Sequence, residues 1–203
     1  MTLPLRTALV WAALGLAVLA PLAAAATSPL LAWRDAIYIA SGFAGIFAMT
    51  LLLVQPLLAA GDLPGRSAGR ARRVHRATGA LLLVAVLVHV GGLWVTSPPD
   101  VVDALLYASP TPFSAWGVTA MWVMFCAAAL ALLRRHLPVR PATWRGGHML
   151  LAAVVALTTV LHAALIDGTM ERMTKIGLSA LVLLANARVI YLKLILPARR
   201  RRG

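Results

Sequence analysis

The sequence predicts an all-α fold, a polytopic membrane protein built as a bundle of six transmembrane helices. Hydrophobic residues make up 61% of the 203 residues and charged residues only 12%, with a mean hydropathy of +0.86. A soluble domain of this size has about twice that charged share. Six apolar segments also reach the length of about 20 residues that a membrane span needs. They cover approximately residues 8–26, 37–60, 74–96, 115–134, 147–166 and 176–196.

The first segment has features of a signal peptide as well as of a helix. Residues 1–26 contain a lone Arg6, an apolar run and the small-residue stretch Ala23–Ala26, which together are typical of a signal sequence. The apolar run is long for that role, so we expect a retained first helix. Cleavage would leave five spans. We therefore divide the chain into a first helix or signal-like segment (1–34), a membrane domain (35–196) and a basic cytoplasmic tail (197–203).

Proline placement separates the first two segments from the other four. Pro21 and Pro56 lie inside the first two and can bend them locally. The four later segments contain no proline, which suits a rigid core that carries ligands. Between the third and fourth segments, residues 97–112 contain four prolines and predict a loop, within which residues 101–107 can form a short surface helix.

The net charge of +13 is distributed unevenly between alternate loops. Arginines gather in three places, listed in chain order: Arg66, Arg70, Arg72, Arg73 and Arg76; Arg134, Arg135, Arg140 and Arg145; and residues 199–202. Five of the six acids lie in the alternate loops: Asp35, Asp100, Asp103, Asp167 and Glu171. Basic loops stay on the cytoplasmic side, so we expect a multi-pass protein of the cytoplasmic (inner) membrane, embedded in lipid, with both termini cytoplasmic. This distribution argues against nucleic-acid binding.

Four histidines form two matched pairs, His75 with His89 and His148 with His162, each pair 14 residues apart. Fourteen helical residues return a side chain to within about 40° of its starting face, about 21 Å further along the axis. Two such helices side by side therefore present two facing histidine couples, stacked across the membrane. Imidazole is a common axial ligand of haem iron, so the pattern predicts two haems and an electron path through the bilayer.

Simpler interpretations remain open for each histidine. His89 and His162 lie deep in apolar segments, where each could instead donate a hydrogen bond to a neighbouring helix. His75 and His148 lie near arginines at the cytoplasmic ends and could be merely solvated, as we expect for His136 in its basic turn. Space for a flat macrocycle is expected at Gly79, Gly146 and Gly147.

Several polar residues have weaker interpretations. Arg72, Arg73, Arg76 and Arg145 could neutralise haem propionates or only set the topology. Cys126 is expected to be a structural core thiol, and Gln55 and Asn186 could bond across helices. We find no glycine-rich nucleotide loop, no nucleophile beside a base and no cysteine cluster for iron–sulfur binding.

Two stretches of sequence resemble a known family. Arg72-Arg73-Val74-His75-Arg76-Ala77-Thr78-Gly79 runs on to His89, and Trp144-Arg145-Gly146-Gly147-His148 runs on to His162. Across residues 35–195 this pattern resembles the ferric reductase-like transmembrane domain, found in ferric reductases, NADPH oxidases and the haem subunit of periplasmic methionine sulfoxide reductase systems. The resemblance implies two haems b, an inner one between His75 and His148 and an outer one between His89 and His162.

The resemblance also has two departures. Ferric reductases and NADPH oxidases continue into a flavin and NAD(P)H domain, which this chain does not contain. We therefore expect an oxidoreductase component that takes electrons from a separate flavin reductase or from quinol and delivers them to an acceptor on the outer face. The length is closer to the methionine sulfoxide reductase subunit, which typically lacks the first of the four histidines. The alternatives are a quinol-oxidising cytochrome b-type anchor and a haem-free transporter or assembly factor.

Overall fold

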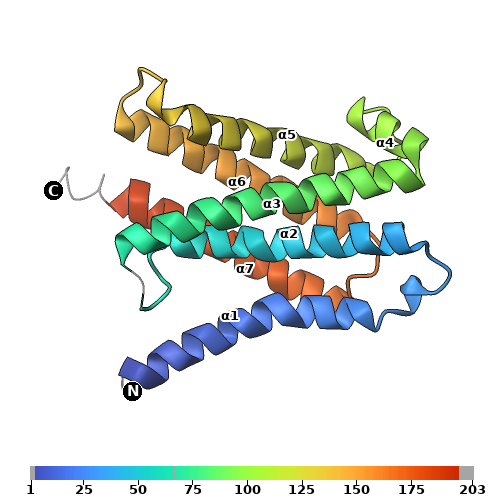
Figure 1. The fold of residues 1–203 in the computed structure, drawn as a ribbon, viewed down its shortest axis with the longest axis horizontal. Coiled ribbons are helices and arrows are strands. Elements are labelled where there is room, and N and C mark those ends of the chain that lie inside the picture. Colours follow the sequence, from blue (N-terminus) through green and yellow to red (C-terminus); the bar gives the residue numbers. More distant parts are fainter. Residues whose placement is uncertain (1–2, 66, 197–203) are drawn as a thin grey trace.

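Seven α-helices and three shorter helical segments account for nearly all of residues 3–65 and 67–196, which the computed structural model describes (Figure 1). No strand occurs in these ranges. The elements are α1 (Leu3–Ala26), η1 (Pro29–Leu31), α2 (Ala36–Ala60), α3 (Ala68–Thr96), α4 (Pro98–Leu105), α5 (Pro112–Leu132), η2 (Leu133–Arg135), α6 (Pro141–Leu165), α7 (Arg172–Ile190) and the π-helical η3 (Tyr191–Ile195). Six are long and apolar enough to cross a membrane, which confirms the predicted fold class.

The helices begin earlier than hydropathy alone indicated. α3 starts at Ala68 because the Ser67 hydroxyl accepts the Arg70 N–H at 3.4 Å and caps the first turn. α6 starts at Pro141, whose fixed φ suits a first helical position and which needs no N–H there. Both helices therefore carry a basic turn ahead of their apolar run. As a result, His75 and His148 each lie seven residues after the first residue of their helix.

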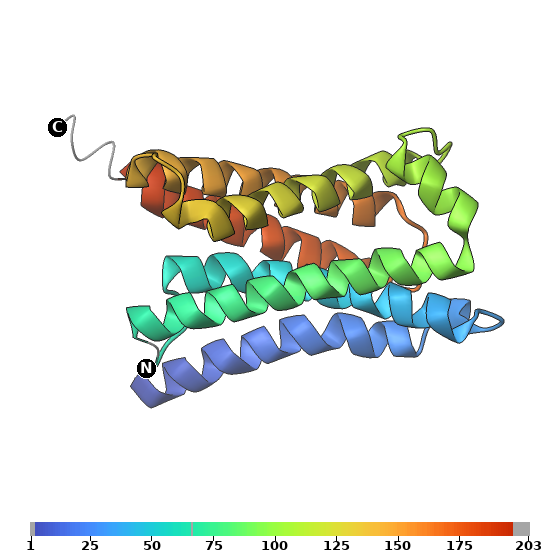
Figure 2. The same cartoon turned by 45° about the horizontal axis from the view of Figure 1, so that its top comes forward.

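Two antiparallel hairpins form the centre of the bundle. α2 packs along α3, and α5 packs along α6 (Figure 1). α7 contacts α2 and α6, whereas α1 lies at the edge of the bundle against α2 and α7 (Figure 2). α2 supplies the largest share of the buried core, and α3, α5, α6 and α7 supply the rest: Ala48, Met49, Leu51, Leu52, Leu53, Leu82, Ala85, Met124, Val155, Ala156, Leu178, Val182 and Ala185.

The two ends of the bundle differ in charge. At one end, here called the basic end, α1 begins, α7 ends and both the α2–α3 and the α5–α6 turns are found (Figures 1 and 2). The described arginines of both turns are here: Arg70, Arg72, Arg73, Arg76, Arg134, Arg135, Arg140 and Arg145. The other end, here called the opposite end, carries α4 and the five acids named above. Arg66 and the predicted tail at 197–203 lie outside the described residues.

The single acid at the basic end is paired. Asp62, in the turn after α2, accepts two hydrogen bonds of 2.9 Å from Nε and Nη2 of Arg188 on α7. This fork-to-carboxylate geometry fixes both partners. It therefore fastens the last turns of α7 to the turn that leads into α3.

Three expectations for individual residues have mixed outcomes. The Gln55 amide donates to the Thr78 hydroxyl at 2.8 Å, so the predicted bond between α2 and α3 is confirmed. Asn186 instead donates to the Val182 carbonyl within its own helix, so that prediction was wrong. Cys126 is exposed on the surface of α5 and is not a core thiol. Sequence hydropathy does not distinguish a lipid-facing from a helix-facing position, since both are apolar.

The expected short helix between the third and fourth spans is present, whereas bending at Pro21 and Pro56 stays a prediction. α1 and α2 continue through Pro21 and Pro56 as single helices. The predicted short surface helix is α4, which starts three residues earlier than expected, at Pro98, and ends at Leu105. α4 lies in the connection between α3 and α5, at the opposite end of the bundle (Figure 1).

Candidate functional site

The structure brings the four predicted histidines together as two facing couples. His75 of α3 faces His148 of α6 near the basic end, with ring centroids 6.5 Å apart and an interplanar angle of 72°. His89 and His162 face each other near the opposite end, also at 6.5 Å and with an angle of 77°. We call these the basic-end couple and the opposite-end couple. All four rings are half-buried, and each couple joins one helix from each hairpin.

Hydrogen bonds at the opposite-end couple fix which ring nitrogen is free. Nδ1 of His89 lies 2.8 Å from the Ser41 carbonyl oxygen on α2, and Nδ1 of His162 lies 2.8 Å from the Phe113 carbonyl oxygen on α5. A carbonyl oxygen only accepts, so Nδ1 carries the proton and Nε2 keeps its lone pair. The expected alternative, a hydrogen bond to a neighbouring helix, is therefore present, and it leaves Nε2 available as a ligand.

Two glycines allow the rings of His89 and His162 to lie close to the backbones of α2 and α5. A Cβ atom on Gly45 would lie 2.9 Å from Nδ1 of His89, and one on Gly117 would lie 2.6 Å from the ring of His162. Each glycine follows its carbonyl residue, Ser41 or Phe113, by four positions, one turn along the same helix face. A side chain there would occupy the space that the imidazole fills. Neither glycine was predicted from the sequence as part of the site.

The carbonyl partners repeat with the same spacing as the histidines. On α2, Ser41 faces His89 and the Gln55 carbonyl oxygen lies 3.3 Å from Nδ1 of His75, and these two partners are 14 residues apart. On α5, the backbone positions facing the two α6 histidines are Phe113 and Ala127, again 14 residues apart. The two hairpins are thus built to the same pattern, which side-chain identity alone did not reveal.

The basic-end couple is held less tightly by the backbone. The His75 contact is longer, at 3.3 Å, and Nδ1 of His148 lies against the Ala127 backbone without completing a hydrogen bond. The residues four positions after Gln55 and Ala127 are the alanines Ala59 and Ala131, where the opposite-end couple has glycines.

Trp144 is a further neighbour of the basic-end couple. Its ring is stacked on His148, with centroids 5.4 Å apart and planes 5° from parallel. Its indole Nε1 donates to the Leu130 carbonyl at 2.9 Å, and the Arg134 guanidinium carbon lies 5.4 Å from its ring centroid. In the sequence, Trp144 was noted only as the first residue of the stretch that runs to His148 and on to His162. Trp144 lies four residues before His148 and therefore on the same helix face, and this spacing could have indicated the contact between the two rings.

The separation within each couple fits two imidazoles that share one metal. Imidazole nitrogens bind metals at about 2 Å, and the ring centre lies about 1 Å behind the nitrogen, so trans ligands have centroids roughly 6 Å apart. The observed 6.5 Å is close to this value in both couples. Among the described residues, no group of three or more His, Cys, Asp or Glu side chains is placed to hold a metal. Two imidazoles alone suit a macrocycle that supplies its own in-plane nitrogens.

An apolar layer separates the two couples. Leu82 lies midway between His75 and His89 on α3, and Val155 midway between His148 and His162 on α6. Both are buried members of the central core. The two couples are therefore distinct sites, separated by packed aliphatic side chains.

The predicted arginines lie at the basic end, close in sequence to the first couple. Arg72, Arg73, Arg76 and Arg145 are all exposed. None of the four forms an ion pair with a described residue. His136 is also exposed and joins neither couple, as expected for a loop residue.

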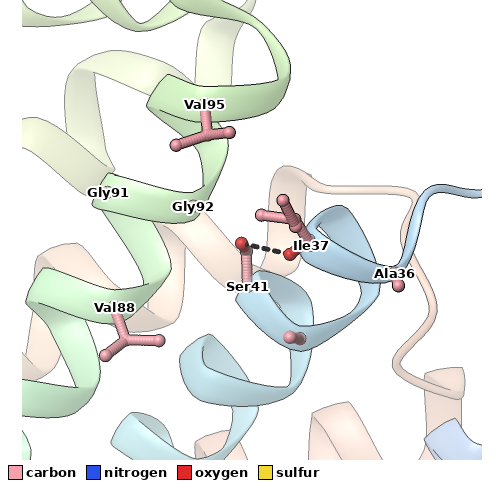
Figure 3. A pocket seen from close by; sticks show the side chains of 8 residues that line it. Ala36, Ile37, Ser41, Val88, Gly91, Gly92 and Val95 are labelled. Carbon is pink, nitrogen blue, oxygen red and sulfur yellow. Dashed lines mark hydrogen bonds between the residues drawn. The ribbon is translucent and has the colours of Figure 1, made fainter.

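A groove of about 430 Å³ lies between α2 and α3 beside the opposite-end couple (Figure 3). Its lining is apolar apart from Ser41, whose hydroxyl donates to the Ile37 carbonyl at 2.6 Å. A Cβ atom on Gly92, across the groove, would meet this hydroxyl directly. The groove contains no titratable side chain, so the candidate site consists of the histidine couples.

Comparison with known proteins agrees with this geometry. A family model described as the ferric reductase like transmembrane component matches residues 41–159, more than half of the chain. The chain belongs to this family. The match includes His75, His89 and His148, and His162 follows three residues after its end. No curated protein and no solved structure matches the chain. Membership of this family is consistent with membrane electron transfer. It also confirms the family resemblance that was predicted from the two sequence stretches running to His89 and to His162.

Proposed function

We propose that this ferric reductase-like chain passes single electrons across a membrane through two b-type haems. His75 and His148 would hold one haem, and His89 and His162 the other. The observation that carries the proposal is the presence of two facing imidazole couples, each with centroids 6.5 Å apart, at two depths of one helical bundle. Family membership supports the same conclusion.

The chain's own residues supply ligation, orientation and insulation. Nε2 of each histidine is the ligand atom, and the hydrogen bonds of Nδ1 to Ser41 and Phe113 hold the opposite-end rings in position. A bound haem supplies reversible one-electron chemistry at its iron. Leu82 and Val155 keep the space between the couples apolar. Arg73, Arg76 and Arg145, exposed beside the basic-end couple, are the candidate partners for haem propionates.

The charge asymmetry of the bundle supports an orientation. Loops rich in arginine remain on the cytoplasmic side of a membrane, which supports a cytoplasmic basic end and, with it, cytoplasmic positions for the start of α1 and the end of α7. The basic-end couple is then the inner site and the opposite-end couple the outer site. We propose the cytoplasmic membrane as the location, a flavin reductase or quinol as donor, and an outer-face acceptor such as a ferric chelate or a periplasmic reductase.

Absorbance spectra of the detergent-purified protein, with haem quantified per chain, test this proposal. We expect two low-spin haems per chain, and about one per chain in each of His75→Ala, His148→Ala, His89→Ala and His162→Ala. His136→Ala is the matched control and should retain both, since His136 joins neither couple. A haem-free protein after expression with ample haem would overturn the proposal and favour a transporter or assembly factor.

The same preparation distinguishes the two donors. Reduction of the wild-type protein by a short-chain quinol, blocked by a quinone analogue, would favour the quinol-oxidising anchor. Reduction by a flavin reductase with NAD(P)H, insensitive to the analogue, would favour a separate flavoprotein partner. If one haem remains in His75→Ala and His148→Ala and also in the wild-type chain, ligation is confined to His89 and His162.

A further inference from the structure

His148 differs from the other three candidate ligands in how its ring is held. Nδ1 of His75, His89 and His162 each contacts a backbone carbonyl oxygen, at 3.3, 2.8 and 2.8 Å. Nδ1 of His148 is buried and lies against the Ala127 backbone, but the geometry of this contact does not complete a hydrogen bond. A metal-ligating histidine normally uses its second nitrogen to fix the ring orientation. His148 therefore needs another source of orientation.

Trp144 is the side chain in position to supply it. The indole lies parallel to the His148 ring, one helical turn closer to the basic end, with centroids 5.4 Å apart. The indole itself is held on two sides, by its hydrogen bond to the Leu130 carbonyl and by the Arg134 guanidinium over its face. A guanidinium above an aromatic face is attractive and limits rotation of the ring. The indole therefore has two contacts of its own besides the stack with His148.

Among the described residues, no other candidate ligand has an aromatic side chain stacked parallel to it; the Phe113 ring contacts His162 edge-on, with centroids 6.0 Å apart and planes at 68°. The residues four positions before His75, His89 and His162 are Ala71, Ala85 and Thr158, which are all too small to cover an imidazole. The large ring at this position therefore occurs only where the backbone hydrogen bond is missing. That coincidence is the basis of the inference.

We infer that Trp144 is the positioning residue of the basic-end couple, orienting His148 by stacking where backbone hydrogen bonds orient the other histidines. The inference rests on the proposed function. It implies that the two haems are retained by different physical means. A change at Trp144 should therefore affect the basic-end haem and spare the opposite-end haem.

The test compares Trp144→Leu, which removes the stack, with Trp144→Phe, which keeps an aromatic face but has no N–H. Trp122→Leu is the control, because Trp122 is an exposed tryptophan on α5 that packs edge-on against Phe125. Haem per chain and the low-spin ferric electron paramagnetic resonance spectrum are measured for each purified protein. Near-perpendicular imidazole planes give strongly anisotropic low-spin signals, so the spectrum reports the orientation of His148 directly.

We expect Trp144→Leu to lose at least half of one haem per chain, or to shift one of the two low-spin signals, with the other unchanged. Trp144→Phe and Trp122→Leu should match the wild type. The unaffected haem shows that the variant has folded. If Trp144→Leu loses both haems, Trp144→Met is measured in its place, with the same expected outcome.

Three results would contradict the inference. Two haems with unaltered signals in Trp144→Leu would show that the stack does not orient His148. An equal loss in Trp144→Phe would assign the effect to the hydrogen bond with Leu130. An equal loss in Trp122→Leu would indicate a general effect of removing a tryptophan. A wild-type protein without haem would instead overturn the proposed function, which the same measurements detect separately.

Discussion

A Cβ atom on Gly117 would lie only 2.6 Å from Cε1 and Nδ1 of His162, so α5 can approach this ring only because residue 117 lacks a side chain. Gly117→Ala should therefore push the ring away from the Phe113 carbonyl, at a cost of about 1–3 kcal/mol, typical of an overpacked interior. Gly45→Ala should act similarly on His89, where the corresponding distance is 2.9 Å. Thermal unfolding and haem content of the opposite-end site are the measurements.

Gly15→Ala is the control for this pair, since a Cβ atom there would meet nothing within 4 Å. It should be neutral or stabilising by up to about 1 kcal/mol, because alanine favours helix more than glycine does. Equal stability of Gly117→Ala and Gly15→Ala would show that the ring has room to move and that the close approach is unimportant.

The bond between Gln55 and Thr78 links α2 to α3 close to His75. Thr78→Val removes the hydroxyl and leaves the amide without its partner, so we expect a loss of about 0.5–1.5 kcal/mol in the free energy of unfolding. Thr96→Val is the control on the same helix, because the Thr96 hydroxyl bonds only to carbonyls of its own helix. Unfolding in mixed micelles compares the two. A larger effect of Thr96→Val would exclude an inter-helix role for Thr78.

The pairing of Asp62 with Arg188 should contribute little to stability despite its good geometry. The Arg188 side chain is 57% exposed and that of Asp62 is 24% exposed, and solvent screens an exposed pair so strongly that its net contribution is small. A double-mutant cycle with Asp62→Asn and Arg188→Gln should give a small coupling energy that falls as salt is added. A coupling that is large and independent of salt would contradict this prediction.

Glu171 caps α7 and should make stability depend on pH. Its carboxylate accepts the N–H groups of Met173 and Thr174, both at 2.8 Å, and these hydrogen bonds lower the pKa of Glu171 below its ordinary value. The capping contribution is therefore complete above the ordinary glutamate pKa and is lost as the pH falls through the lowered pKa of the folded protein. Thermal unfolding followed between neutral and acidic pH measures it.

Glu171→Ala is the comparison for that measurement. The variant should melt earlier than the wild type at neutral pH, and the difference between the two proteins should shrink towards acidic pH, where the wild-type carboxyl is protonated. A difference that stays constant over the whole pH range would show that the carboxylate charge has no part in capping α7.

The proposed orientation predicts which end of the bundle is reachable from outside the cell. In a Cys126→Ala background, Ala108→Cys places a thiol at the opposite end and Ala142→Cys places one at the basic end, both at exposed positions. A membrane-impermeant maleimide should label the first in intact cells, and the second only after permeabilisation. The reverse pattern would invert the proposed topology and exchange the inner and outer sites.

The spans and the histidine couples could be predicted from sequence because both follow from regular spacing along single helices. Hydropathy identified all six membrane spans, and the 14-residue offset placed His75 opposite His148 and His89 opposite His162, as the structure has them. Helix starts were placed too late, since the basic turns before His75 and His148 are helical without being apolar. That the histidines bind haem stays a prediction.

The groups that hold the histidine rings could not be predicted in the same way. Their acceptors are backbone carbonyl oxygens, which every residue has, so no side chain marks Ser41 or Phe113 as a partner. Space for a macrocycle was expected at Gly79, Gly146 and Gly147. A Cβ atom on Gly146 would meet nothing within 4 Å, whereas one on Gly79 would contact Gln55 of α2 and one on Gly147 would contact Leu130 of α5. The glycines that lie closest to histidine rings are Gly45 and Gly117. Their role could not be predicted because it depends on which helices are neighbours in the fold.

Ser41 and Gln55 lie on one uninterrupted helix and contact histidines of different couples. The spacing of their carbonyl oxygens along α2 therefore matches the spacing of the two couples along the bundle. Substitutions at either residue leave the carbonyl oxygens in place, so a scan of side chains would pass over them. One residue inserted between them would instead rotate one carbonyl by about 100° and move it by about 1.5 Å relative to the other. The spacing of the two carbonyls therefore depends on the number of residues between them, a constraint separate from the one that excludes a side chain at Gly45 on the same face of α2.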